Sequence, residues 1–437
     1  MLTAFTRAFK TPDLRRKLLF TLAIIVIFRL GSVVPTPGVS YKSVQECLKN
    51  ADQTSGVLGL ANLFSGGALL QLSIFALGIM PYITASIIVQ LLTVVIPRFE
   101  ALKKEGQQGQ TKMTQYTRYL TIGLAVLQSS TLITFAQNPQ ALFGAQCTSI
   151  LSDTTIPTLV IMVLTMTAGT GVVMWLGEVI TDKGIGNGMS LLIFTSIASR
   201  FPSSLWAIKQ EQNRWDIFIG VILMGFVVIA LVVFVEQSQR RIPVQYAKRQ
   251  VGRQMYGGTS TYIPLKVNMA GVIPVIFAAS LIALPQLVAQ FNRSTTGDQA
   301  GWVTFIERYL VKGDHPLYMI LYTALIIFFT FFYVSITFNP TEVADNMKRY
   351  GGFIPGIRAG RPTAEYLDYV LTRITVPGAI YLGAISLIPL IALVLVNANQ
   401  NFPFGGTSIL IIVGVGLETV KQIESQLQQR HYEGFLR

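Results

Sequence analysis

Ten long apolar stretches constrain this chain more than any other feature of its sequence. An α-helix needs about 20 mostly apolar residues to cross about 30 Å of hydrocarbon, and the stretches together cover almost half of the 437 residues. Charged residues make up only 13% of the chain, about half the usual share in soluble proteins. We therefore predict an all-α membrane protein with ten transmembrane helices, which excludes a soluble enzyme, a disordered chain and a disulfide-stapled secreted domain. The predicted spans are residues 18–34, 70–96, 119–135, 156–180, 188–201, 217–235, 269–288, 317–338, 374–396 and 408–420.

The distribution of basic residues predicts the orientation of these spans. With the N-terminus in the cytoplasm, the cytoplasmic segments hold 25 of the 34 Lys and Arg residues, and the outer side holds 8 when Arg200, at the outer end of the fifth span, is counted with its loops. Arg29 lies within the first span. An excess of Lys and Arg marks the cytoplasmic side of a membrane protein, so we expect both termini to be cytoplasmic. Two interpretations of the excess stay open: orientation alone, or a docking surface for a polyanionic partner.

The spans divide evenly between the two halves of the chain. Five crossings in residues 1–202 and five in residues 203–437 give the halves opposite orientations, which is typical of an inverted repeat with a transport path at its interface. The basic N-terminal segment precedes a long apolar run without a small-residue processing site, so we expect the first span to be retained.

The two cysteines, Cys47 and Cys147, both fall in predicted outer loops. An oxidising compartment would allow them to form a disulfide, but nothing in their spacing requires one. Two free thiols are the preferred interpretation.

Two predicted cytoplasmic loops, residues 237–268 and 339–373, are longer than a connection between neighbouring helices requires. Loops of this length in a compact protein are usually functional or disordered, and the glycines and prolines between residues 351 and 362 favour a shaped second loop. Both loops are rich in basic residues: Arg240, Arg241, Lys248, Arg249, Arg253 and Lys266 in the first, and Lys348, Arg349, Arg358, Arg361 and Arg373 in the second.

A short apolar segment, residues 57–71, lies in the outer loop before the second span. Leu60, Leu63 and Phe64 have the spacing of one helical face, and the following Ser65, Gly66 and Gly67 are suited to end a helical turn. The pattern fits a short re-entrant helix that folds back towards the membrane. It fits equally well an amphipathic helix on the outer surface.

Catalytic and metal-binding signatures are almost absent. The two histidines, His315 and His431, lie in an outer loop and in the C-terminal tail, which rules out a His-based triad or zinc site within the membrane, and no Walker A motif occurs. We expect no catalytic residues, no metal and no cofactor. A secondary transporter of a small solute is the alternative function, but the membrane interior offers few ionisable residues beyond Arg29 and Glu418.

Long motifs occur in order along nearly the whole chain. They are FSGGALLQLSIFALGIMPYITASIIVQLLTVV (Phe64 to Val95), KKEGQQGQTKMTQYTRY, MWLGEVITDKGIGNGMS, QRRIPVQYAKRQVGR, PLKVNMAGVIPVIF, FNPTEVADNMKRYGGFIPGIR and FGGTSILIIVGVGLE. Together they resemble the SecY family, the channel subunits of the bacterial Sec protein translocon. The resemblance implies a non-enzymatic channel, built from two inverted five-helix halves, that moves unfolded secretory polypeptides across the membrane and releases transmembrane segments sideways into lipid.

The family's constriction is a ring of apolar side chains. Such a ring gates by dewetting and offers no fixed charge on which one particular substrate would stick. From the residues alone, isoleucines at i and i+4 indicate ordinary helix packing. The resemblance assigns the pore ring to Ile79, Ile83, Met189, Ile193, Ile276 and Ile411.

The resemblance also implies two moving parts. It makes residues 57–71 a re-entrant plug helix that rests against the outer side of the ring in the idle channel, with Leu60, Leu63, Phe64, Ser65, Gly66 and Gly67 in the plug. It places Thr84, Gln128 and Asn268 in a lateral gate between the halves. Isolated polar residues that help helices to pack remain the alternative for these three.

The two basic loops match the family's docking sites for the ribosome, through its RNA and proteins, and for the SecA ATPase. Guanidinium and ammonium groups pair with RNA phosphates, so this binding should weaken with salt. Further partners that the resemblance implies are the small membrane subunits SecE and SecG, unfolded precursor polypeptides and the lipid bilayer, in the inner (plasma) membrane of the cell. The docking residues are Lys248, Arg249, Arg253 and Arg358, with Gln254 where relatives often carry a second basic residue beside Arg253.

Overall fold

The structure is a computed structural model, and it contains two compact units. Unit 1 comprises Met1–Phe218, Leu393–Pro403 and Ile411–Arg437, and unit 2 comprises Ile219–Ala392 and Phe404–Leu410. The residues that the structure describes are 9, 11–50, 65–137, 139, 147, 149–212, 215–246, 249–251, 254–256, 260–291, 301–311, 315–396 and 406–433.

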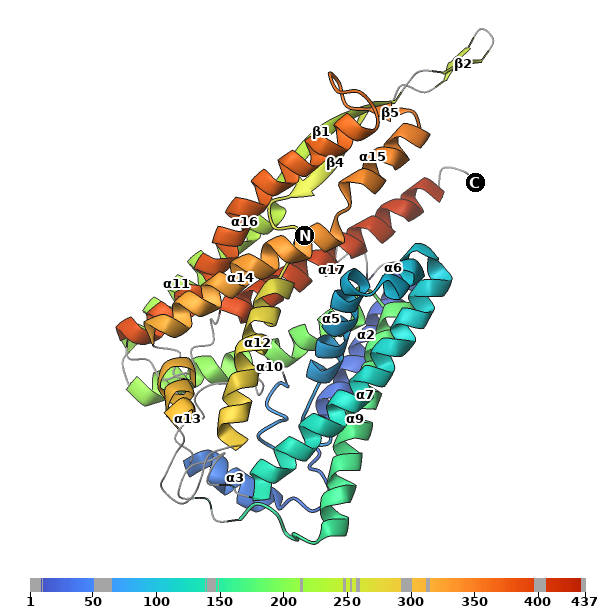
Figure 1. Cartoon of the computed structure of the whole chain (residues 1–437). Helices are drawn as coiled ribbons and strands as arrows, with labels where there is room; N and C mark the ends of the chain where they lie inside the picture. Colours follow the sequence, from blue (N-terminus) through green and yellow to red (C-terminus); the bar gives the residue numbers. More distant parts are fainter. Residues whose placement is uncertain are drawn as a thin grey trace. The chain divides into compact units, whose positions relative to one another are not determined.

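Unit 1 is built on antiparallel packing of long apolar helices. Helix α5 packs on α7, α7 on α9, and α9 on both α10 and α2 (Figure 1). Proline lies in the first turn of α2, α5, α6 and α9, where its missing N–H leaves no intrahelical hydrogen bond unmade. The helices are α2 (Pro12–Gly31), α3 (Tyr41–Asn50), α5 (Met80–Val95), α6 (Pro97–Lys104), α7 (Gln107–Gln137), α9 (Ile156–Lys183) and α10 (Gly188–Gln212).

Unit 2 contains most of the remaining helices and the strands that the structure describes. Helix α12 packs on α14, and the last helix, α17, begins in unit 2 and continues into unit 1. The helices are α11 (Trp215–Gln237), α12 (Ile273–Phe291), α13 (Gly301–Ile306) followed by a π-helix (Glu307–Val311), α14 (Pro316–Thr337), α15 (Pro340–Arg349), α16 (Arg361–Val396) and α17 (Gly406–Glu433).

Several helices have the length and composition of membrane spans. Within the described ranges, four helices qualify: Ile156–Lys183, Phe218–Gln237, Pro316–Arg349 and Arg361–Ile388. The pair α5 and α6, bent by 100°, would make a fifth. Each of the ten predicted stretches overlaps a helix, but the count of ten spans stays a prediction.

The second predicted stretch, residues 70–96, is not a single helix, so that boundary was wrong. Residues 65–79 form a run of turns, and α5 begins only at Met80. The segment pairs with the chain after α2, because Thr36 donates from both its backbone N and its Oγ1 to the Leu72 carbonyl, and Ile74 N donates to the Val34 carbonyl. Long-range hydrogen bonds therefore replace the helical ones that the apolar composition favoured.

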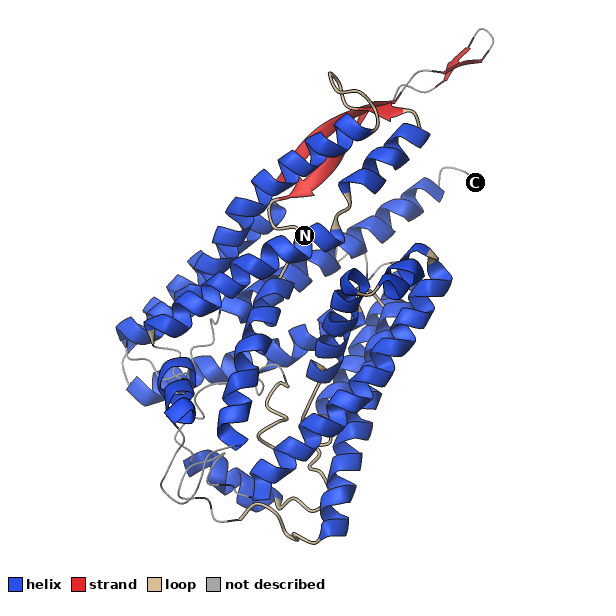
Figure 2. Cartoon of the chain, in the orientation of Figure 1, coloured by secondary structure: helices blue, strands red, loops and turns tan. Residues whose placement is uncertain are grey.

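The long basic loops contain strands, which corrects the all-α prediction. Strands β1 (Gln239–Tyr246) and β4 (Ser260–Lys266) are antiparallel, and β5 (Gly352–Phe353), from the second loop, pairs with the far edge of β1 (Figure 2). Inward-facing Ile242 and Val244 pack with Leu265 from β4 and Leu367 from α16. Strands β2 (Arg249–Val251) and β3 (Gln254–Tyr256) form a second hairpin.

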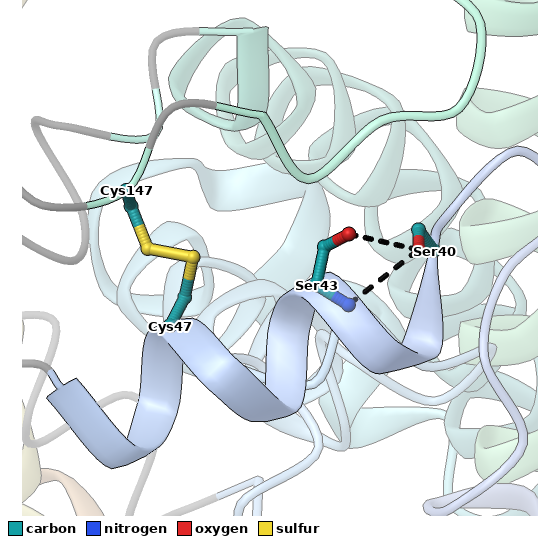
Figure 3. Close-up of a disulfide and its surroundings, with 4 residues drawn as sticks. All are labelled: Ser40, Ser43, Cys47 and Cys147. Carbon is teal, nitrogen blue, oxygen red and sulfur yellow. Dashed lines mark hydrogen bonds between the residues drawn. A yellow bond between two sulfur atoms is a disulfide. The ribbon is translucent and has the colours of Figure 1, made fainter.

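The preference for free thiols was also wrong. Cys47 on α3 and Cys147, beyond α7, form a disulfide with a Cα–Cα distance of 5.6 Å (Figure 3). Both cysteines are buried in a core cluster that also contains Val44 and Ile150. Packing in this cluster brings together two residues separated by 100 positions in sequence, which no local pattern could have revealed.

Candidate functional site

The segment from Ser65 to Ile79 is held on several sides within unit 1. The rings of Phe28, on α2, and Phe75 stack with centroids 6.1 Å apart. A Cβ atom on Gly31 would collide with the Phe75 ring, and one on Gly169 of α9 would collide with the Ile74 carbonyl. These close approaches show that glycines on both helices make room for the segment.

Three of the predicted plug residues belong to the start of this segment. Ser65 is 1% exposed, and its Oγ accepts a hydrogen bond from Leu69 N at 3.1 Å. Gly66 and Gly67 follow with φ of 67° and 93°, a conformation that favours glycine. Leu60, Leu63 and Phe64 lie outside the described residues.

Most of the predicted ring residues are buried. Ile79, Ile193 and Ile411 of unit 1 are 2%, 8% and 3% exposed, and Ile276 of unit 2 is 8% exposed. Burial is common to a pore ring and to an ordinary helix core, so the ring stays a prediction.

Two ring candidates have local surroundings that the sequence did not indicate. Ile79 lies just before α5 rather than within it, and its carbonyl accepts a hydrogen bond from Ile83 N at 3.1 Å. Met189 lies against α9, because a Cβ atom on Gly177 would collide with the Met189 sulfur. A flexible thioether therefore fills the space over a glycine.

The three predicted lateral-gate residues are divided between the units. Thr84, on α5, donates its hydroxyl to the Met80 carbonyl at 3.0 Å, and Gln128 is half-buried on the adjoining α7. Asn268, in unit 2, donates to Glu236 Oε1 at 2.6 Å and to the Gly271 carbonyl at 3.2 Å. The interaction with Glu236 was missed by sequence reasoning, although a carboxylate at the end of an apolar helix needs a partner.

An ion pair between α7 and α9 was also missed. Arg118 Nε and Nη2 donate to the two carboxylate oxygens of Glu178 at 2.9 and 2.8 Å, and Nη1 donates to Gln115. The hydrogen bond to Glu178 raises the pKa of Arg118 above its usual value. The sequence could have indicated this ion pair, because Arg118 and Glu178 carry opposite charges near the same end of two adjacent predicted spans.

The predicted docking residues that the structure describes lie on two separate segments of the basic loops. Arg358 is exposed between β5 and α16, and its carbonyl accepts a hydrogen bond from Thr363 Oγ1 at 2.7 Å. Arg249 belongs to β2, while Lys248 and Arg253 lie outside the described residues. On β1, the guanidinium of Arg241 lies 4.8 Å from the centroid of the Tyr262 ring. Exposed cations are therefore carried on strand and loop backbone of defined conformation.

Comparison with known proteins decides the family. A model of the SecY family matches residues 73–420. The chain is 68% identical to the protein translocase subunit SecY of Streptomyces galbus over 443 residues, which covers all of both chains. This chain belongs to the SecY family.

Solved SecY-type channels share its fold. One is a SecY protein whose plug domain stabilises the closed state of the translocation channel and maintains a membrane seal, with a TM-score of 0.61 at 20% identity. Another is Sec61 in the canine ribosome–channel complex from the endoplasmic reticulum, with a TM-score of 0.60 at 18% identity. Each similarity covers 94% of this chain and 91% of the other. This SecY-family chain, with several helices long and apolar enough to span a membrane, is a mostly helical, multi-pass membrane protein.

Proposed function

We propose that this SecY-family chain is a protein-conducting channel. It moves unfolded secretory polypeptides across the membrane and releases apolar segments sideways into lipid. The observation that carries this function is the 68% identity, over its full length, with a protein translocase subunit SecY. The chain itself performs no catalysis, and a partner supplies the energy for transport.

The proposed pore ring consists of Ile79, Ile83, Met189, Ile193, Ile276 and Ile411. Apolar side chains exclude water and ions from a narrow idle pore and leave a translocating chain without strong binding sites. The burial of Ile79, Ile193, Ile276 and Ile411 supports positions away from the lipid-facing surface. Their convergence on one pore is part of the proposal.

The proposed plug comprises residues 57–71, and the proposed lateral gate contains Thr84, Gln128 and Asn268. Residues 65–79 are held by contacts with α2, the chain after α2, and α9. These contacts support a plug that is anchored at its C-terminal end. Hydrogen bonds between helices in a membrane contribute only about 0.6 kcal/mol on average, which suits a gate that must open.

The proposed topology has ten spans in two inverted halves, residues 1–202 and 203–437, with both termini in the cytoplasm and the protein in the inner membrane. The charge distribution of the sequence supports this orientation. The proposed partners are SecE, SecG, the SecA ATPase and the ribosome. Exposed Arg358 and the basic hairpin around Arg249 support a polyanionic docking partner.

Reconstitution tests the proposed function. The chain, purified with the small subunits that accompany it and placed in proteoliposomes, should import a secretory precursor only when SecA and ATP are present. Protease protection of the precursor measures import. Uptake of a small solute driven by an ion gradient, without precursor import, would instead establish a secondary transporter.

A further inference from the structure

Two arginines from different helices of unit 1 hold the turn at Gly66 and Gly67. Arg29, on α2, donates a hydrogen bond from Nη1 to the Gly66 carbonyl at 3.2 Å. The guanidinium of Arg200, on α10, lies against Gly67, because a Cβ atom there would be 2.7 Å from Nε and 2.8 Å from Nη2. Successive residues of one turn are therefore in contact with two separate cations.

The backbone of helix α10 also packs closely against the Gly66–Gly67 turn. A Cβ atom on Gly66 would lie 3.2 Å from both the Cα and the carbonyl oxygen of Ser196. Ser196 and Arg200 are separated by four positions on α10, so they lie on the same helical face. Both glycines have a left-handed backbone conformation and leave little room for a Cβ atom. Any other residue type at these positions would be strained.

The positions of the two arginines are unusual for a membrane protein. Arg29 lies within an apolar helix and Arg200 lies at the end of an apolar stretch, and both side chains are half-buried. Charged groups at such depth are costly and generally have a function. A guanidinium group offers five N–H donors in a rigid plane, which suits it to hold backbone carbonyls in one conformation.

The chain on the C-terminal side of this turn is fixed independently of the arginines. Thr36 binds the Leu72 carbonyl, and Phe75 packs against Gly31 and Phe28. Loss of either arginine should therefore release residues 65–67 without displacing residues 72–79. The two arginines therefore contact the chain just before the fixed residues 72–79, within the proposed plug.

We propose that Arg29 and Arg200 form a clasp on the Gly66–Gly67 turn that sets how often the idle channel opens. This inference rests on the proposed channel function. It assigns to Arg200, in particular, a positioning role: its guanidinium holds the turn, and the turn holds residues 65–67, which are part of the proposed plug, in the closed position. Neither arginine is needed to move the precursor itself.

The test measures ion leakage through the idle channel. The full chain with its accompanying subunits is placed in proteoliposomes as wild type, Arg29→Gln, Arg200→Gln and Arg16→Gln. Each glutamine variant of the clasp should raise potassium efflux about tenfold, which corresponds to about 1.4 kcal/mol. This is close to the effect of losing one hydrogen bond to a charged group, such as the one that Arg29 makes with the Gly66 carbonyl. Arg16→Gln, the same change at an exposed position of α2, should leave efflux unchanged.

Driven transport is measured on the same vesicles. Both clasp variants should still import a precursor with SecA and ATP, which shows that they are folded and that only gating has changed. The clasp would be refuted if potassium efflux in Arg29→Gln or Arg200→Gln stayed at the wild-type rate. It would also be refuted if Arg16→Gln raised efflux as much as the two clasp variants do. If Arg200→Gln does not accumulate in the membrane, Arg200→Lys is tested in its place. Lysine keeps the charge but lacks the planar guanidinium group, so we expect potassium efflux to rise two- to threefold. Unchanged efflux in this variant would refute the clasp. Failure of the wild type to import any precursor would instead refute the proposed channel function.

Discussion

At the scale of single residues, Asp153 shows how one carboxylate orders the start of a long helix. It lies just before α9 and accepts hydrogen bonds from Thr155 N at 3.2 Å, Thr155 Oγ1 at 2.9 Å and Thr158 Oγ1 at 3.2 Å. The hydrogen bonds from the Thr155 side chain and backbone hold the pKa of Asp153 below its ordinary value of 3.8. The stabilisation is therefore complete above that value and is lost as the pH falls through the lower pKa of the folded protein.

We expect Asp153→Asn to lower the thermal unfolding midpoint at pH 6, because the amide is a weaker acceptor than the carboxylate. At pH 2 the difference between the variant and the wild type should be smaller, because the carboxylate is lost as the pH falls through the lowered pKa of the folded protein. Scanning calorimetry in detergent at both pH values measures this difference. Asp345→Asn, on the exposed face of α15, is the control, and an Asp153→Asn effect of equal size at both pH values would contradict the assignment.

At the scale of secondary structure elements, the disulfide fixes α3 to the chain beyond α7. It closes a loop with a sequence separation of 100, and cross-linking a loop of that length stabilises a protein by roughly 2–5 kcal/mol. Reductant should therefore lower the unfolding midpoint of the wild type. The double variant Cys47→Ala with Cys147→Ala should already have the lower midpoint and should not respond to reductant. Two reactive thiols in the unreduced wild type would disprove this account.

At the scale of the whole molecule, the asymmetry of basic residues predicts which parts face the cytoplasm. Thr154, in the segment just before α9, and Ala359, in the loop between β5 and α16, are both exposed. The proposed topology places them on opposite sides of the membrane. Both native cysteines form the disulfide, so a membrane-impermeant maleimide should react only with an added cysteine. In right-side-out vesicles it should label Thr154→Cys directly, but Ala359→Cys only after permeabilisation. The opposite pattern would invert the topology.

The sequence by itself determined where most of the helices lie and what kind of protein this is. Apolar composition and length act locally, because a continuous apolar run must satisfy its own backbone hydrogen bonds in lipid. The predicted stretches for α9, α11, α14 and α16 therefore lie within or closely match the observed helices. The motifs between Phe64 and Glu418 were likewise sufficient for the family.

Only the tertiary structure decided the features that depend on partners distant in sequence. The turns of residues 65–79 follow from hydrogen bonds to residues 34–36 and from glycines on α2 and α9. The disulfide follows from a shared core cluster, and the pairing of β1 with β5 joins Tyr246 to Gly352. Arg200 lies at the end of the predicted fifth span, where nothing in the sequence linked it to Gly67, and α10 places its guanidinium against that glycine. Each outcome depends on which groups meet in space, and local composition carries no information about that.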